Sequence, residues 1–263
     1  MYIRSSLVLL MVFVSFIGCS KKEPKTNALS PSELLITLFK AKSFDDEGRG
    51  IWKPTSAERK QFNTYDDGLC HTSVDTIMMF NGVDGKEAVV IFYTWPLADC
   101  HACSPDMSIA LFASASDDGP WTYKRMNKNI GRWGAWGNSA KVQLWHIGDN
   151  NRYALDIEDG YMGQGIMNEG LYLYSLDDFK EIFTLQTHED NSGNTEEESE
   201  LYNWDKKVTV IHSAGTSGYY DLQVATSGKG VATGDDNNSK IVELSGTDRY
   251  HYDDNAKRYV LVK

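Results

Sequence analysis

The stretch TIMMFNGVDGKEAVVIFYTW (residues 76–95) carries the pattern that decides the fold. Two runs rich in β-branched, aromatic and other apolar residues, Thr76–Phe80 and Ala88–Trp95, flank the turn sequence NGVDGK. Such runs, separated by a few residues that include Gly, Asn and Asp, are typical of a β-hairpin. The sequence therefore predicts an antiparallel hairpin near the start of the main domain.

The same pattern of apolar runs separated by turn residues recurs to the end of the chain. Further strand-like runs, separated by turns, lie at Ser108–Ala113, Trp121–Arg125, Val142–Ile147, Tyr153–Ile157, Leu171–Leu176, Phe179–Gln186, Val208–His212, Tyr219–Thr226, Ile241–Leu244, Arg249–Tyr252 and Tyr259–Val262. About a dozen strands in sequential pairs predict an all-β fold of serial antiparallel hairpins. We expect a propeller-like ring, with an up-and-down barrel or a sandwich as the alternatives.

A short helical segment is expected before the β domain. Ser30-Pro31-Ser32-Glu33 has the form of a capping box with proline at the first helical position. Apolar residues at helical spacing follow it, namely Leu34, Leu35, Leu38 and Phe39. We expect a helix over 31–42 and a second short one within 56–65. Residues 30–66 would form a helical prelude that packs beside a single β domain over 67–263.

The first residues have the organisation of an export signal. Arg4 precedes an apolar run over 7–17, which is shorter than the roughly 20 residues of a membrane-spanning helix but matches a signal peptide. The run ends in Phe16-Ile17-Gly18-Cys19, which resembles the lipobox of bacterial lipoprotein precursors. The resemblance implies that residues 1–18 are removed as a signal peptide and that Cys19 is acylated.

Lipidation at Cys19 would place the protein on a membrane, since several acyl chains on one residue anchor a protein stably. Residues 19–29 are mostly polar and predict a short lipidated tether. Ser20 follows the cysteine, and by resemblance to enterobacterial sorting rules this favours the outer membrane. The expected location is the cell envelope, with the protein facing the periplasm and the lipid bilayer as its first partner.

The net charge narrows the class of further partners. The full chain has a formal charge of −11, and loss of Arg4 with the signal peptide gives −12 (−11 minus one positive charge). Nucleic acids are bound through Lys and Arg, so an acidic chain argues against them. We expect an envelope protein or a glycan instead.

Two C-terminal stretches resemble known β-proteins. GYYDLQVATSG (218–228) resembles the Gly-Tyr-x-Asp-Leu strand of FG-GAP and related propeller repeats. RYHYDDNAKRYVLVK (249–263) is similar to the closing hairpin of many bacterial envelope β-proteins, although Asn255-Ala256 stands where that motif has glycine. These resemblances support the expected fold more than any activity.

The sequence CHAC contains the most reactive group of residues, with Cys100, His101 and Cys103 after an apolar run. A c-type haem needs histidine directly after the second cysteine, and Ser104 stands there, so haem attachment is excluded. A thioredoxin-like redox pair is one alternative. The sequence does not offer that family's later proline or its alternation of strands and helices.

Metal binding is a second alternative. A zinc site could draw on Cys70, His71, Cys100, His101 and Cys103. An oxidising compartment argues against it, since exported thiols are seldom kept reduced. Three thiols remain once Cys19 is lipidated, which predicts one bridge and one leftover cysteine. We favour a structural disulfide from Cys70 to Cys100 or Cys103.

Two further features allow binding interpretations. Trp133 and Trp136 could form an aromatic platform for a sugar ring or peptide, but we favour core positions beside glycine bends. The acidic segment 188–200 alternates ligand-like residues, yet it lacks the glycine and glutamate positions of an EF-hand loop. We favour a solvated loop over a calcium site there.

Common catalytic signatures do not occur in the sequence, which has no G-x-S-x-G elbow, no H-E-x-x-H and no Walker loop. The leading expectation is therefore an anchored, non-enzymatic binding or scaffold module of the cell envelope that needs no cofactor. The alternative is a thiol-redox or metal-handling protein that uses CHAC.

Overall fold

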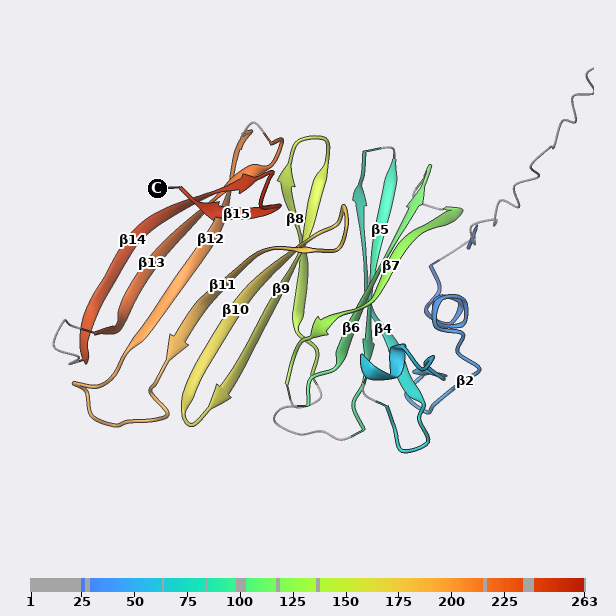
Figure 1. Cartoon of the computed structure of the whole chain (residues 1–263), viewed down its shortest axis with the longest axis horizontal. Helices are drawn as coiled ribbons and strands as arrows, with labels where there is room; N and C mark the ends of the chain where they lie inside the picture. Colours follow the sequence, from blue (N-terminus) through green and yellow to red (C-terminus); the bar gives the residue numbers. More distant parts are fainter. Residues whose placement is uncertain are drawn as a thin grey trace, which may run out of the picture.

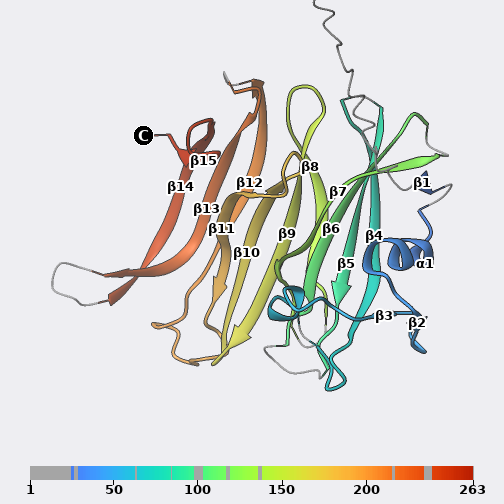
Figure 2. The same cartoon turned by 45° about the vertical axis from the view of Figure 1, so that its right-hand side comes forward.

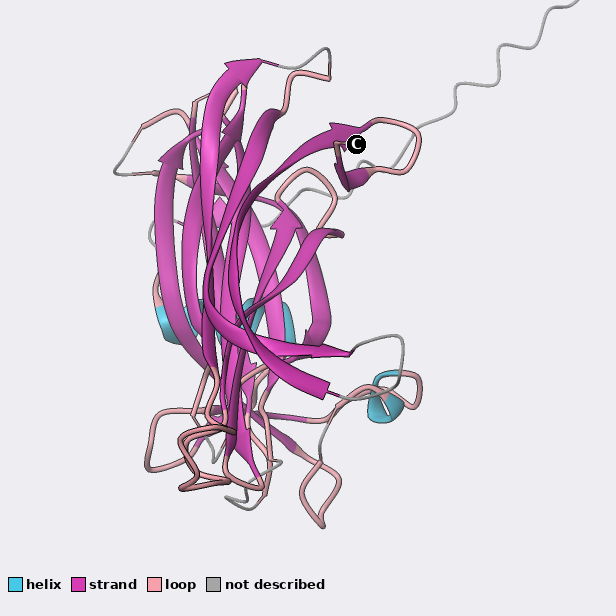
Figure 3. Cartoon of the chain, turned by 90° about the vertical axis from the view of Figure 1, so that its left-hand side faces the viewer, coloured by secondary structure: helices cyan, strands magenta, loops and turns pink. Residues whose placement is uncertain are grey.

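The computed structural model contains two antiparallel β-sheets, and their strands dominate the chain (Figure 1). The described residues are 25–26, 29–62, 64–83, 85–97, 103–116, 119–135, 138–214, 217–233 and 239–262. Figure 3 shows only short helical pieces among them. The predicted all-β fold with a short helical segment is confirmed. Within these residues, no helix is long and apolar enough to span a membrane.

The first sheet holds the N-terminal half of the described chain, in the order β1-β7-β6-β5-β4-β3-β2. Its strands are β1 (Lys25–Thr26), β2 (Ser43–Phe44), β3 (Gly50–Trp52), β4 (Cys70–Asn81), β5 (Lys86–Thr94), β6 (Asp106–Ser114) and β7 (Trp121–Arg132). The hairpin predicted over 76–95 is present as the antiparallel pair β4 and β5.

The second sheet is a meander in which each strand pairs with the next. Its strands are β8 (Lys141–Gly148), β9 (Arg152–Gly163), β10 (Ile166–Ser175), β11 (Glu181–Asp190), β12 (Asn203–Ala214), β13 (Tyr220–Thr233), β14 (Ser239–Asp253) and β15 (Arg258–Leu261). The runs 241–244 and 249–252 belong to one strand, β14. Its ladder with β13 continues through Ser245 and Gly246 without a turn.

The prelude begins with a capped helix. Ser30 accepts the backbone N–H of Glu33 at the start of α1 (Pro31–Leu34), and a π-helical turn, η1 (Leu35–Phe39), continues it. The helix ends sooner than predicted, at Lys40, whose φ of 62° is left-handed. A side-chain cap at one end and a left-handed residue at the other limit the helix to this short span.

The prelude covers one face of the first sheet (Figure 2). The second short helix is η2 (Glu58–Lys60), inside the range predicted for it. Buried prelude residues form one apolar core with β5 and β6, namely Leu34, Leu35, Phe39, Trp52 and Phe62. This segment therefore belongs to the packed fold.

Strand β5 is buried on both faces, which explains its continuous apolar run. The even-numbered residues over 88–92 pack against the prelude, and the odd-numbered residues over 89–93 pack against the second sheet. Successive strand residues point to opposite faces, so a strand between two layers is apolar at every position. The first sheet thus has a core on each side.

The second sheet curls back on itself. Strand β8 contacts β12, β15 contacts β11, and Gly148 forms an isolated bridge to Tyr219. A third apolar core fills the inside of this curl, with Ile147, Leu173, Phe183, Leu222 and Tyr259 among its buried members. The curl brings together strands that are not neighbours in the sheet.

The prediction of a propeller-like ring is wrong. A propeller consists of separate four-stranded blades around a channel, whereas pairing here is continuous across seven strands and then across eight. The two sheets pack face to face through a shared core, which is closest to the sandwich alternative. Local hairpin spacing does not distinguish these architectures, because sequential antiparallel strands build both.

Candidate functional site

Strands β11 and β12 form a fork in the second sheet. Their ladder contains three residue pairs only, which join 188–190 of β11 to 203–205 of β12. Beyond Thr187 and Lys206 the strands separate, since β12 crosses to contact β8 while β11 stays paired with β10. The fork follows from the curl of the sheet.

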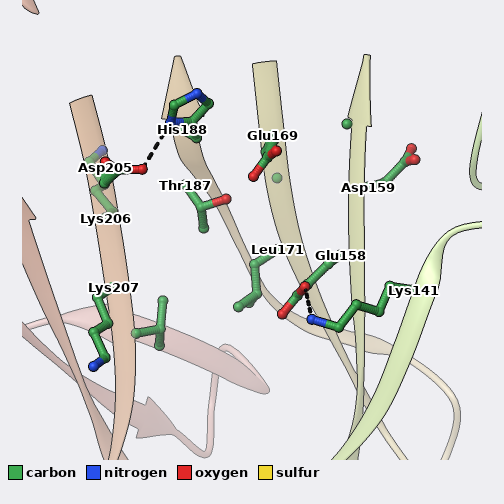
Figure 4. A pocket seen from close by; sticks show the side chains of 13 residues that line it. Lys141, Glu158, Asp159, Glu169, Leu171, Thr187, His188, Asp205, Lys206 and Lys207 are labelled. Atoms are coloured by element: carbon green, nitrogen blue, oxygen red, sulfur yellow. Dashed lines mark hydrogen bonds and ion pairs between the residues drawn. The ribbon is translucent and has the colours of Figure 1, made fainter. Parts of the chain in front are cut away.

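A pocket of about 440 Å³ lies where the two strands separate (Figure 4). Its walls come from the five strands β8 to β12, and most of its lining side chains are polar or charged. The residues that define its chemistry are Lys141, Glu158, Glu169, His188, Asp205 and Lys207. A pocket lined in this way suits a charged, polar ligand more than an apolar one.

Two ion pairs fix part of the lining. Lys141 Nζ lies 2.5 Å from Glu158 Oε2, and this hydrogen bond raises the pKa of Lys141. His188 Nδ1 lies 2.9 Å from Asp205 Oδ1 and holds the mouth of the fork together. Both pairs connect neighbouring strands, so they stabilise the local pairing as well as setting the charge of the pocket.

Two charged side chains remain available to a ligand. Glu169 on β10 and Lys207 on β12 both line the pocket, and neither has an ion-pair or hydrogen-bond partner within the described chain. Figure 4 shows Lys207 on the strand of Asp205, and Glu169 on a strand between His188 and Asp159. The lining is mixed in charge, since Lys141 pairs with Glu158 on one side and Asp205 lies beside Lys206 and Lys207 on the other.

A buried carboxylate lies next to the acidic wall. Asp156 Oδ2 accepts Gln143 Nε2 at 2.7 Å, and Gln143 also donates to Glu158 Oε1 at 3.1 Å. Asp156 Oδ1 is buried and has no hydrogen-bond partner in the described structure. Burial raises the pKa of Asp156 to about 6, against the lowering effect of Gln143 and with a further increase from the charge of Glu158.

One pair of lining residues has the form of part of a catalytic site. The pair of His188 and Asp205 could act as a base with its orienting carboxylate. A nucleophilic enzyme also needs a hydroxyl or thiol hydrogen-bonded to that base, and none bonds to His188 among the described residues. The carboxylates and ammonium groups of the lining can hold complementary charges of a ligand.

The predicted disulfide from Cys70 is not present in the structure. Cys70 is a thiol that lies fully buried in the core between the prelude and the first sheet. Burial raises its pKa to about 12, with smaller increases from the charges of Asp106 and Glu58. Cys103 is disulfide-bonded. Cys100 and His101 lie outside the described residues.

Two of the residues named for the alternative zinc site point apart, and two others, Cys100 and His101, lie outside the described residues. Cys70 and His71 are neighbours on β4, so their side chains point to opposite faces. His71 Nδ1 bonds to Asp45 Oδ2 at 2.8 Å, and its ring stacks on Tyr65 with centroids 4.1 Å apart. No group of three or more metal-binding side chains occurs in the part of the chain that the structure describes.

The structure describes only some of the residues named for the other predicted sites. The Trp133 ring is partly buried, lies with its centroid 4.4 Å from that of Tyr172, and packs against the core between the sheets. Trp136 and Cys19 lie outside the described residues. In the acidic segment, Asp190 is used locally, since it accepts Ser192 N at 2.7 Å and Asn203 Nδ2 at 2.9 Å.

Sequence reasoning missed the pocket because its residues come from five strands that only the curl brings together. One signal was available. Asp156-Ile157-Glu158 places two carboxylates on the same face of a strand whose other face is apolar. No protein-family model, curated protein or solved structure matches this chain.

Proposed function

We propose that the protein is a lipid-anchored module of the cell envelope, facing the periplasm, that binds a charged envelope component without chemically changing it. The observation that carries this proposal is the pocket at the fork between β11 and β12, which is lined by both carboxylates and ammonium groups. Charge complementarity then determines the ligand class, which is polar and carries charged groups.

The position of the first strand is compatible with the proposed anchor. Strand β1 begins at Lys25, six residues after Cys19 (25 minus 19), and pairs with the outer edge of β7. The pocket lies in the other sheet, and Figure 1 shows the strands that line it, β8 to β12, on the far side of β5 and β6 from β2. An anchor at Cys19 would therefore leave the pocket accessible to components beyond the membrane surface.

Photo-crosslinking in intact cells tests the binding. A benzophenone amino acid replaces Thr187 in the pocket and, as the control, Val83 in the β4–β5 turn, which is 71% exposed. We expect a discrete adduct from position 187 and none from position 83. Muramidase digestion distinguishes a glycan adduct from a protein adduct. Absence of the Thr187 adduct, or equal labelling at both positions, would contradict the proposal.

A thiol-redox function is the second candidate, because Cys103 is disulfide-bonded and belongs to the Cys-x-x-Cys motif. This function would require the bridge to be reducible and to exchange with substrate thiols. Catalysed reduction of insulin by the purified protein, lost in Cys103→Ser, would favour it over the binding function. A bridge that resists mild reductant would remove it.

A further inference from the structure

Strand β14 has an outer edge that the described chain leaves mostly unpaired. β13 pairs with one side of β14 over residues 239–250, whereas β15 pairs with the other side over 250–253. A bond from Val262 N to Arg249 O extends the contact on the β15 side by one residue. The outer edge over 239–248 therefore has no strand beside it within the described residues, and Figure 1 shows β14 at the margin of the second sheet.

One end of this edge extends past the rest of the sheet. β12 pairs with β13 as far as Lys229, and β13 then continues to Thr233 with β14 as its neighbour. Residues 230–233 and 239–242 thus form a two-stranded arm in the described structure, with Val231 on it 50% exposed. Two strands alone are marginally stable in water. An open edge on such an arm is a place where another strand can pair.

We propose that β14 of a second copy of this chain pairs with this edge, antiparallel and around a two-fold axis, so that the two eight-stranded sheets join into one. The inference goes beyond the proposed function, because none of the residues that line the pocket at the fork belongs to β14. A two-fold contact uses the same surface on both copies. The edge must therefore complement its own sequence when that sequence is reversed.

A two-fold axis at Leu244 gives this complementarity. In that register Leu244 is opposite itself, and Lys240 of each copy is opposite Asp248 of the other. Both charged side chains are exposed, and neither has an ion-pair partner within the described chain. Opposite charges that face each other across paired strands stabilise the pairing, and the symmetry provides this contact twice.

Gly246 supports the same register. It is opposite Val242 of the second copy when the axis lies at Leu244. A Cβ atom added at Gly246 would have no heavy atom within 4 Å, so the face of β14 at this residue is open. Val242 and Gly246 lie on the same face of β14, since the ladder with β13 has no bulge between them. Each valine would cover the open glycine of the other copy.

The two neighbouring symmetric registers lack these contacts. An axis at Glu243 places two carboxylates directly opposite each other, which is unfavourable. An axis at Ser245 places Lys240 opposite Tyr250, whose outer edge β15 already occupies. Charge and edge accessibility therefore both select the axis at Leu244.

Charge exchange tests the pairing in the full-length protein. Sedimentation velocity in detergent measures dimerisation of the wild type, Lys240→Asp, Asp248→Lys and the variant that carries both substitutions. We expect each single substitution to weaken dimerisation by about tenfold, because it places like charges opposite each other twice. The double variant should return to the wild-type affinity.

The design separates a specific contact from net charge. The chain has a formal charge of −11, so repulsion by net charge alone would make Asp248→Lys dimerise more tightly than the wild type. Thermal melting confirms that each variant is folded. A wild-type protein that stays monomeric at every concentration, single variants that dimerise like the wild type, or a double variant that does not recover would overturn the proposal.

Cysteine cross-linking tests the register independently of charge. Opposite residues in an antiparallel pair have Cα atoms about 4.5–5.5 Å apart, which is within the range of a disulfide. We expect copper-phenanthroline oxidation to link Leu244→Cys into a dimer. Val231→Cys, on the β13 side of the same arm, is the matched control and should stay monomeric, as should the wild type. No link at Leu244→Cys, or equal linking in both variants, would overturn this register.

Discussion

Gln143 of β8 donates its side-chain amide to Asp156 of β9 at 2.7 Å, and the two residues are directly opposite each other in the strand register. This bond satisfies one oxygen of a carboxylate that is completely buried and leaves the other without a partner in the described structure. The unbound protein therefore keeps an electrostatic cost at Asp156, and that cost has measurable consequences.

The first consequence is a pH-dependent stability. The pKa of Asp156 is about 6 in the folded protein and 3.8 ordinarily, so the unfolded state releases this proton more readily. The contribution of Asp156 to the free energy of unfolding is therefore fully present below about pH 4. It is lost as the pH rises through about 6. We expect Asp156→Asn to be more stable than the wild type by about 1–3 kcal/mol near pH 8.

Urea unfolding near pH 4 and near pH 8 measures this difference. The gain from Asp156→Asn should be much smaller at the lower pH, because the wild-type carboxyl is then largely protonated. Glu197→Gln, an exposed acid in the turn after β11, is the control and should change little at either pH. A variant that is clearly less stable than the wild type near pH 8 would contradict the account.

Asp45 has the opposite pH dependence. Burial raises its pKa, but hydrogen bonds from His71 and Arg49 outweigh that effect and hold it at about 2. Its contribution is therefore present above the unfolded value of 3.8 and lost as the pH falls through about 2. We expect Asp45→Asn to cost about 1–2 kcal/mol at neutral pH in urea unfolding.

The neighbouring Asp46 provides the matched control for Asp45, since it is exposed and Asp46→Asn removes the same charge from the same turn. We expect Asp46→Asn to stay within about 0.5 kcal/mol of the wild type. Equal effects of the two substitutions would mean that net charge, and not the contact with His71, determines the stability.

Cys70 should be chemically inert in the folded protein. Its side chain is fully buried and its pKa is about 12, so almost no reactive thiolate is present at neutral pH. We expect no reaction with a thiol reagent until guanidinium chloride unfolds the chain. Val83→Cys, at a position that is 71% exposed, is the positive control. Rapid labelling of Cys70 in the native protein would show that the prelude does not cover it.

Labelling with radioactive palmitate tests the lipid anchor. The lipobox-like sequence before Cys19 predicts label in the wild-type protein and none in Cys19→Ala. The unlabelled variant should also leave the membrane fraction, because no other acyl chain would hold it there. Label that survives in Cys19→Ala would contradict the anchor.

The sequence contains enough information to place most strands, because apolar runs and turn residues are local signals. β5 illustrates this, since its run over 88–95 has no polar interruption before Thr94. The arrangement of these strands into sheets is harder to predict from the sequence. Whether serial hairpins close into blades or extend into two sheets depends on contacts such as β8 with β12, which no single hairpin encodes.

The candidate site likewise depends on long-range contacts more than on local sequence signals. Cys70, Cys100 and Cys103 attracted attention because cysteines are rare and reactive, yet Cys70 faces a closed apolar core. The pocket residues are ordinary carboxylates and lysines on separate strands. They form a site only through the curl of the second sheet, so no spacing in the sequence reveals them.

The central claim is that the pocket at the fork between β11 and β12 binds an envelope component through its charged side chains. The most direct measurement is the yield of the Thr187 photo-adduct in intact cells, compared between the wild type and the pocket variant Glu169→Gln. The account predicts a strong adduct that Glu169→Gln weakens and that Glu243→Gln, outside this pocket, retains. An adduct of equal yield in all three proteins, or no adduct in the wild type, would contradict it.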